Sequence, residues 1–204
     1  MMAPIQWPLE AIWEAVVPGL PGFSLEVLPQ IDSTNTELMR RARAGHLEPV
    51  LLVAEHQSAG RGRLGREWLS GQDPAQAAGS TRAPLASLTF SIGLPLAPAD
   101  WSGLSLAVGV SVAQSLHPEL RLKWPNDVWW RDRKMAGILI ETVSLGDSGT
   151  ARYAVVGVGI NIAPRDATGL STPPAWLREV LPGAECCAGL VASGCTPGTG
   201  AQGL

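Results

Sequence analysis

Residues 120–162 read LRLKWPNDVWWRDRKMAGILIETVSLGDSGTARYAVVGVGINI. In the first five of these residues, leucine and tryptophan alternate with arginine and lysine, as in a strand with one apolar and one polar face. Apolar runs predict three further strands, at 128–131, 135–143 and 152–162. Only short polar turns separate them, at 132–134 and 146–149. Because strands joined by short turns pair antiparallel, this segment predicts the core of a largely antiparallel sheet.

The N-terminal half adds strands and helices to this sheet. Apolar residues recur at helical spacing over 8–17 and 104–116, and strands are expected at 23–31, 50–55 and 88–94. A further helix is expected to start at Thr34, with Thr34 as its cap and Glu37 reaching back. The sequence therefore predicts an α/β chain of the α+β kind, with a mixed, largely antiparallel β-sheet flanked by helices.

The composition is that of one globular domain with a sizeable core. The 204 residues are 46% hydrophobic and carry 15 basic against 18 acidic side chains, a balance that gives no broad attraction to nucleic acid or to an anionic membrane. No apolar run is long enough to cross a bilayer, and the N-terminal residues lack the basic leader of a signal peptide. The cysteines, all in the last twenty residues, form no recognisable disulfide framework or metal-binding pattern. We therefore expect a cytoplasmic protein.

The segment 57–68, QSAGRGRLGREW, is the strongest local signal for a binding site. Its three glycines allow backbone N–H groups to turn toward an anion, and its three arginines supply fixed positive charge. The alternative is a solvated loop that binds nothing or contacts RNA. Because the segment follows a buried strand and ends on Trp68, we expect an ordered anion-binding loop.

A second motif, Lys123-Trp124-Pro125-Asn126-Asp127, stands at the end of a predicted strand. Its ammonium, amide and carboxylate suit a nucleotide phosphate together with a divalent cation. Proline, asparagine and aspartate also form turns without any ligand. The motif is therefore compatible with a nucleotide site but does not establish one alone.

Two glycine-containing strands complete the set of motifs. In the segment 133–139, a glycine within the strand that follows Lys134 indicates close approach of a ligand or of another backbone, whereas an isolated hairpin lysine would be an ordinary surface residue. In the segment 157–161, two glycines precede an asparagine. Such glycines can equally accommodate a bulky neighbour such as Trp124 or Trp129.

Taken together and in this order, the motifs resemble the catalytic domain of the biotin–protein ligase family, in its monofunctional form without a DNA-binding domain. The resemblance runs from Ile31 to Ile162 and also includes Ile31-Asp32-Ser33-Thr34-Asn35 and Glu141. It implies the biotin–lipoate ligase fold, which is similar to that of class II aminoacyl-tRNA synthetases. It further implies an enzyme that uses ATP and Mg²⁺ to convert biotin to biotinyl-5′-AMP with release of pyrophosphate. The biotinyl group then passes to a lysine of the biotin carboxyl carrier protein of acetyl-CoA carboxylase.

The resemblance also assigns roles to individual residues. The residues implied to bind biotin are Ser33, Thr34, Asn35, Gln57, Arg61, Gly62, Arg63, Lys134, Gly137 and Gly157. Those implied to bind the nucleotide are Arg63, Arg66, Trp68, Lys123, Asn126, Asp127 and Asn161, and Asp127 is also the implied metal ligand. The implied catalytic residues are Arg63, Lys123, Asp127 and Lys134. The set is physically coherent, because cationic groups can screen the repulsion between a carboxylate and the α-phosphate that it attacks.

Three features depart from the family pattern. The residues ahead of Ile31 are too few for a helix-turn-helix module, so no DNA binding is expected. Residues 71–83 form an insertion where the family has a short link, which puts an asparagine contact to the nucleotide in doubt. Residues 1–183 are expected to form the catalytic domain, and residues 184–204 an atypical, disordered tail in place of the family's C-terminal β-barrel.

Two other functions stay open on the sequence alone. A lipoate-type ligase shares the fold and similar chemistry, although the glycine–arginine loop and the Lys-Trp-Pro-Asn-Asp motif argue against it. A truncated, non-catalytic protein that binds biotin or biotinyl-adenylate would fit the altered C-terminus. The sequence also does not distinguish a monomer from a homodimer, because an exposed sheet edge could pair two copies or stay alone.

Overall fold

The computed structural model describes residues 5–70, 85–146, 151–165, 167 and 172–181. In chain order its elements are α1 (Leu9–Val16), β1 (Ser24–Leu28), α2 (Thr34–Arg43), β2 (Val50–Ala54), the 3-10 helix η1 (Arg63–Gly65), β3 (Ser87–Leu96), α3 (Leu104–Leu116), β4 (Arg121–Lys123), β5 (Asp127–Trp130), β6 (Arg133–Ser144), β7 (Arg152–Asn161) and α4 (Leu177–Val180). The expected insertion at 71–83 and the expected tail at 184–204 lie outside the described residues.

The strands of the described part form one sheet, in the order β1-β2-β3-β7-β6-β5-β4. β1 and β2 run parallel, and the other neighbouring pairs are antiparallel. Each of the strands β4 to β7 lies beside the strand that follows it in the chain, as the short connections between them predict. The predicted mixed, largely antiparallel sheet flanked by helices is confirmed.

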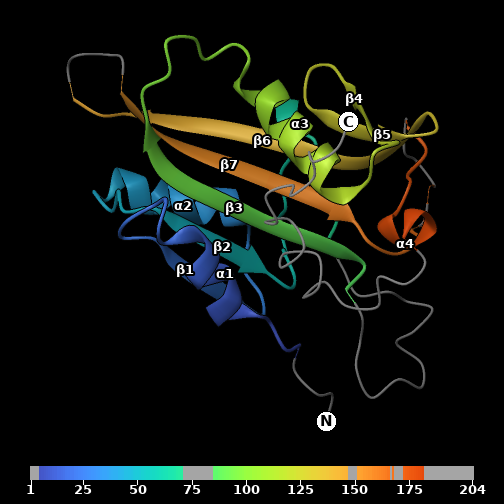
Figure 1. Cartoon of the computed structure of the whole chain (residues 1–204), viewed down its shortest axis with the longest axis horizontal. Helices are drawn as coiled ribbons and strands as arrows, with labels where there is room; N and C mark the ends of the chain where they lie inside the picture. The colour runs from blue at the N-terminus through green and yellow to red at the C-terminus, as the bar shows by residue number, and fades with distance from the viewer. Residues whose placement is uncertain (1–4, 71–84, 147–150, 166, 168–171, 182–204) are drawn as a thin grey trace, which may run out of the picture.

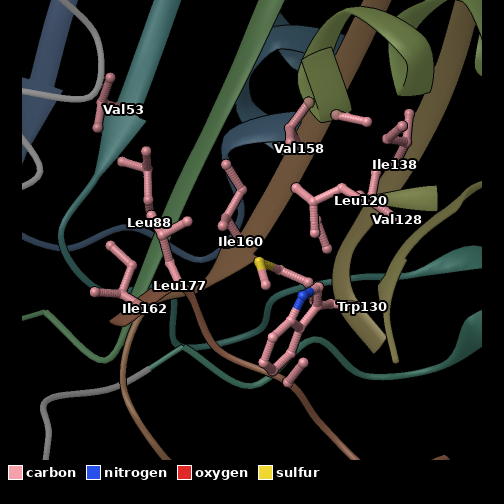
Figure 2. Packing of buried hydrophobic residues seen from close by; sticks show 14 of the residues in the cluster. Val53, Leu88, Leu120, Val128, Trp130, Ile138, Val158, Ile160, Ile162 and Leu177 are labelled. Carbon is pink, nitrogen blue, oxygen red and sulfur yellow. The ribbon is translucent and has the colours of Figure 1, made fainter. Parts of the chain in front are cut away.

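One face of the sheet packs against α1 and α3, and the opposite face packs against α2 (Figure 1). The alternation of side chains along each strand explains this division. Val158 and Ile160 of β7 belong to the α1–α3 side, where they join Leu88 and Ile138 in the cluster that Figure 2 shows. Burial of such apolar surface is the dominant stabilising term, worth roughly 25 cal/mol for each Å² removed from water.

The α2 side of the sheet has a smaller apolar cluster. Leu38, which has no exposed surface, and Met39 pack there with Leu52 and Tyr153. The Tyr153 hydroxyl donates to the carbonyl of Glu48 at 3.1 Å, and burial raises the pKa of Tyr153 to about 12. This cluster fixes α2 against β2, β3, β6 and β7.

Next to this cluster, the same face of the central strands carries small side chains. These residues are Thr89 and Ser91 of β3, Gly137 of β6, and Gly157 and Gly159 of β7. The register pairs Gly159 with both Thr89 and Gly137, and it pairs Gly157 with Ser91. A face without large side chains leaves room between the sheet and the segments that cover it.

The start of α2 differs from the sequence prediction. Ser33, not Thr34, is the N-cap, because the Ser33 hydroxyl accepts from the N–H of the third helical residue at 3.4 Å. Thr34 instead donates to Gln57. Glu37 does not reach back to the cap but pairs with Arg41 at 2.8 Å, one helical turn further on. The predicted capping box is therefore wrong, and the helix begins one residue earlier than a cap at Thr34 implies.

The β4–β5–β6 region also differs in detail. Arg131 and Asp132 have φ angles of 45° and 61°, as the two central residues of a tight hairpin turn require. The turn therefore precedes the expected position at 132–134, and β6 already begins at Arg133. Trp124, expected on the apolar side of its strand, lies beyond β4 and is 78% exposed. Among the described helices, none combines the length and the apolar character needed to span a bilayer.

We expect Leu38→Ala to lower the free energy of unfolding by about 2–5 kcal/mol, because it leaves a cavity under α2. Leu9→Ala is the matched control: Leu9 is 41% exposed, so its loss is expected to cost only about 0.5 kcal/mol. Urea denaturation followed by circular dichroism measures both values. Equal losses in the two variants would contradict the packing of α2 described here.

Candidate active site

A cavity of about 700 Å³ opens over the small residues on the α2 face of the sheet. Its lining comes from the start of α2, the loop 57–69, the strands β3 to β7, the β4–β5 turn and the segment after β7. All the site residues inferred from the sequence line it, namely Ser33, Thr34, Asn35, Gln57, Arg61, Gly62, Arg63, Arg66, Trp68, Lys123, Asn126, Asp127, Lys134, Gly137, Gly157 and Asn161. The fold therefore brings together residues from five separate stretches of sequence.

The floor of the cavity is made by strand glycines that lie directly under other side chains. A Cβ at Gly157 would lie 2.0 Å from Asn35 Oδ1, and a Cβ at Gly159 would lie 2.3 Å from the Trp68 indole. Both distances are far inside van der Waals contact, so these positions require glycine. The bulky side chain that Gly159 accommodates is Trp68. The sequence had suggested Trp124 or Trp129 for this place, and that suggestion is wrong.

A buried polar network lies at the end of the cavity beside the N-terminus of α2. The N–H and Oγ1 of Thr34 both donate to Gln57 Oε1, at 2.7 and 3.1 Å. Ser91 Oγ lies 2.7 Å from Thr34 Oγ1 and 2.6 Å from Asn35 Oδ1. Asn35 Nδ2 donates to Glu141 Oε2 at 3.0 Å. These fixed donors and acceptors suit a small polar group that carries both N–H and C=O.

The loop 57–69 forms one wall of the cavity and has its own internal framework. The Trp68 N–H donates to the carbonyl of Gly60 at 2.9 Å. A Cβ at Gly60 would lie 2.3 Å from the Trp68 carbonyl oxygen, so the loop closes only with glycine there. At its tip Leu64 and Gly65 have φ angles of 58° and 72°. These contacts agree with the ordered loop expected from the sequence.

The cavity lining is strongly cationic. Among the described residues that line it, six are basic and two are acidic, in a chain whose formal net charge is −3. Lys134 Nζ lies 2.8 Å from Asp127 Oδ1, and Lys123 Nζ lies 3.6 Å from the centroid of the Trp129 ring. An excess of positive charge in a concave site attracts carboxylates and phosphates.

Two arginines of the loop reach across the cavity. Arg61 forms an ion pair with Glu141 of β6, and Arg63 Nη1 donates to Asn126 Oδ1 at 3.4 Å. Asn126 is itself fixed, because its Nδ2 donates to the carbonyl of Ile138 at 2.7 Å. The loop is therefore tied both to β6 and to the β4–β5 turn.

Asn161 joins three segments in addition to lining the cavity. Its Nδ2 donates to the carbonyls of Lys134 and Ala175, at 3.1 and 3.0 Å. Its Oδ1 is buried without a hydrogen-bond partner among the described residues, and the same holds for Trp68 Nε1. Because buried polar groups are normally paired, a ligand can use one acceptor and one donor here.

Asp127 is the residue best suited to a divalent cation. Within the described part of the chain, no three His, Cys, Asp or Glu side chains are grouped to hold a metal ion. A nucleotide-bound Mg²⁺ needs only one or two carboxylates besides the phosphates. The carboxylate of Asp127 at the cavity wall fits that requirement.

Two residues that contact the site were assigned no role from the sequence. Glu141, quoted only as part of the matched pattern, bonds to both Asn35 and Arg61. Arg165, just beyond β7, lines the cavity and donates to the carbonyl of Leu69 at 2.6 Å. No motif marks Arg165, which stands alone four residues after Asn161.

Comparison with known proteins gives the family of this chain. Residues 27–161 match the model of the biotin/lipoate A/B protein ligase family. The chain is 42% identical over 154 residues to the bifunctional ligase/repressor BirA of Escherichia coli, covering 72% of this chain and 43% of BirA. It is 39% identical over 163 residues to the biotin–[acetyl-CoA-carboxylase] ligase of Mycobacterium tuberculosis, covering 72% of this chain and 54% of that protein. The chain belongs to the biotin/lipoate A/B protein ligase family, and it spans about half the length of these curated relatives.

Solved structures lead to the same family. The biotin protein ligase of Aquifex aeolicus in complex with biotin and ATP matches with a TM-score of 0.59 at 28% identity, covering 84% of this chain and 66% of that chain. An R40G mutant of the same ligase in complex with biotin matches with a TM-score of 0.60 at 29% identity, with the same coverage. The biotin–lipoate ligase fold implied by the sequence resemblance is confirmed.

We expect Gly159→Ala to displace Trp68 from the cavity floor, because the added Cβ would overlap the indole. Trypsin should then cleave at the loop arginines about tenfold faster, since overpacking weakens the closed loop. Mass spectrometry of the fragments locates the cuts. Gly103→Ala is the control, because no heavy atom lies within 4 Å of a Cβ at Gly103. Unchanged cleavage of Gly159→Ala would contradict the placement of Trp68.

Proposed function

We propose that this protein is an ATP-dependent biotin–protein ligase. It converts biotin and ATP to biotinyl-5′-AMP with release of pyrophosphate, and it then transfers the biotinyl group to a lysine of a carrier protein. The supporting observation is that Arg63, Lys123 and Lys134 line one cavity together with the buried network of Thr34 and Gln57. The relatives that are biotin ligases, and the Aquifex aeolicus ligase bound to biotin and ATP, support the same activity.

The buried polar network is the proposed site for the ureido head of biotin. That head offers two N–H donors and one carbonyl acceptor, which match side chains at the start of α2. The residues proposed to surround the head are Ser33, Thr34, Asn35, Gln57 and Gly157. Since the two hydrogens of Asn35 Nδ2 are engaged by Leu139 and Glu141, Asn35 serves mainly to hold the network in place.

The other end of the cavity is the proposed site of the carboxylate and the nucleotide. The residues proposed for the carboxylate end of biotin are Arg61, Gly62, Arg63, Lys134 and Gly137. Those proposed for ATP are Arg63, Arg66, Trp68, Lys123, Asn126, Asp127 and Asn161. Trp68 and Asn161 support this assignment, because each has a buried polar atom without a partner among the described residues.

In the first step a carboxylate oxygen of biotin attacks the α-phosphorus of ATP, and the bond to pyrophosphate breaks. Both reactants are negative, and Lys134 and Arg63 lower the barrier by binding the carboxylate and the α-phosphate. Lys134 is paired with Asp127 at 2.8 Å. When a phosphate binds, Lys134 therefore exchanges the carboxylate of Asp127 for the phosphate. Asp127 is the proposed ligand of Mg²⁺, which when bound neutralises charge on the phosphates.

In the second step the amine of the carrier lysine attacks the carbonyl carbon of the mixed anhydride. An amide bond forms, and AMP leaves with the bonding electron pair. The amine loses a proton, and Asp127 is proposed to orient it or to accept that proton. The arginines of the loop 57–69 cover the anhydride and limit its hydrolysis by water.

The proposed carrier is the biotin carboxyl carrier protein of acetyl-CoA carboxylase, in the cytoplasm. No DNA partner and no membrane partner are proposed, and a monomer and a homodimer are both compatible with the proposal. Residues 1–183 are proposed as the catalytic domain, because the described lining of the cavity runs from Ser33 to Pro174. A chain ending at residue 183 is therefore expected to label the carrier at the parent rate.

We expect Lys134→Ala and Arg63→Ala each to reduce the formation or retention of the adenylate by about 10²–10³-fold, since each removes a charge aimed at the transferring phosphate. ATP–pyrophosphate exchange measures formation, and filtration of the enzyme-bound adenylate measures retention. Arg43→Ala is the control, because Arg43 is exposed at the end of α2 and does not line the cavity. Parent rates in both site variants would refute the assignment.

A lipoate-type ligase is a second candidate, because the family includes lipoate ligases. The dithiolane ring of lipoate has no N–H or C=O group to match the network of Thr34 and Gln57, which favours biotin. Pyrophosphate exchange with each acid separates the two candidates. Exchange with lipoate alone would overturn the biotin assignment.

A non-catalytic binder is the third candidate, and it predicts a different outcome with a carrier. Mass spectrometry of a carrier domain incubated with the chain, biotin and MgATP is expected to show the gain of one biotinyl group. Tight binding of a non-hydrolysable biotinyl-adenylate analogue without that gain would instead support the non-catalytic binder.

A further inference from the structure

Arg165 makes two contacts with the end of the glycine–arginine loop. Its Nη2 donates to the carbonyl of Leu69 at 2.6 Å, and its guanidinium carbon lies 5.4 Å from the centroid of the Trp68 ring. Both distances are those of direct interactions, a charge-assisted hydrogen bond and a cation–π contact. None of the ion pairs within the described part of the chain includes Arg165.

The two groups that Arg165 contacts decide where the loop lies. Trp68 rests on the cavity floor over Gly159, and its N–H closes the loop on Gly60 at 2.9 Å. The three arginines of the loop lie between Gly60 and Trp68 in the sequence. Fixing Trp68 and Leu69 to the segment after β7 therefore fixes the base from which these arginines extend.

Arg165 is half-buried, and this burial has an electrostatic cost. Desolvation lowers the pKa of its guanidinium from the usual value, although arginine keeps its charge in proteins. A half-buried cation is retained at such a cost when its contacts offset the lost hydration. The Leu69 carbonyl and the Trp68 ring are such contacts, and both belong to the loop.

We propose that Arg165 is a positioning residue that clamps the loop 57–69 in its closed position over the cavity. This inference deepens the proposed ligase function, on which its second test rests. Through Trp68 and Leu69, Arg165 holds the arginines over the reactive mixed anhydride, and its removal allows the anhydride to escape or to hydrolyse. Arg165 acts through the loop and does not itself need to contact the reacting atoms.

The first test measures the loop directly and needs no ligand. In Arg165→Ala, amide hydrogen exchange in the peptide 57–69 is expected to become about tenfold faster, because one charge-assisted hydrogen bond is lost. Arg152→Ala is the matched control, since Arg152 stacks on Trp101 at 5.2 Å, outside the cavity lining. It should leave exchange in 57–69 unchanged. Equal exchange in the parent and Arg165→Ala would overturn the clamp.

The second test separates a clamp from a direct phosphate ligand. Arg165→Ala is expected to release preformed biotinyl-5′-AMP about tenfold faster. Because the loop carries residues proposed to bind ATP, a rise in the KM for ATP is expected only together with faster exchange in 57–69. Arg165→Lys keeps the charge but loses the planar fork, so we expect it to restore release only in part. A tenfold rise in the KM for ATP with unchanged exchange in 57–69 would overturn the proposal in favour of nucleotide binding.

The two tests also distinguish failure of the clamp from failure of the ligase proposal. If the parent chain forms no biotinyl-adenylate, the proposed function fails, whereas the exchange measurement on Arg165→Ala still decides whether the loop is clamped. If the parent forms the adenylate and the exchange rates are equal, only the clamp fails. Circular dichroism melting of Arg165→Ala is expected to match the parent within a few degrees, which shows that a change in exchange is local to the loop.

Discussion

The contact between Trp68 and the backbone of β7 is the constraint on which the site depends. A Cβ at Gly159 would lie 2.3 Å from the indole, so only glycine allows the tryptophan to reach the sheet. With Trp68 resting there, the loop arginines line the same cavity as Lys123 and Lys134. A single methyl group on β7 can therefore change the electrostatics of the cavity without touching any charge, because close-packed interiors transmit small displacements.

Local patterns in the sequence predicted the pieces of the fold better than their arrangement. Short turns specify the antiparallel order of β4 to β7, whereas no local pattern specifies that β3 lies between β2 and β7. The site shows the same limit. The motifs located the residues that line the cavity, but the contact of Glu141 with Asn35 and Arg61 depends on packing of α2 and the loop against β6. The importance of Arg165 likewise follows from contacts with residues almost a hundred positions away.

Part of the positive charge of the cavity is matched within the protein. Lys134 is paired with Asp127, Arg61 with Glu141, and Lys123 lies over an indole ring. Lys134 is half-buried, and a half-buried charge without a partner is costly, which accounts for its pairing with Asp127. An incoming carboxylate or phosphate exchanges partners with Lys134 and Arg61, whereas Arg63 and Arg66 form no ion pair within the described residues and can meet it directly. The net gain from each contact is small, so geometry, more than the number of charges, has to discriminate between ligands.

The polar network is fixed more firmly than the loop 57–69. Under the proposed function, this difference affects the order in which the parts of the ligand bind. Thr34 and Asn35 are buried and fixed between α2 and the sheet, so the head-group site exists before any ligand binds. Arg61 and Arg63 are exposed and extend from a loop whose ends are held by a few contacts. Preformed groups bind without an ordering cost, whereas loops lose entropy when they close. Recognition of the head group is therefore expected to come first, and the exposed arginine side chains then rearrange around the place where the two acids meet.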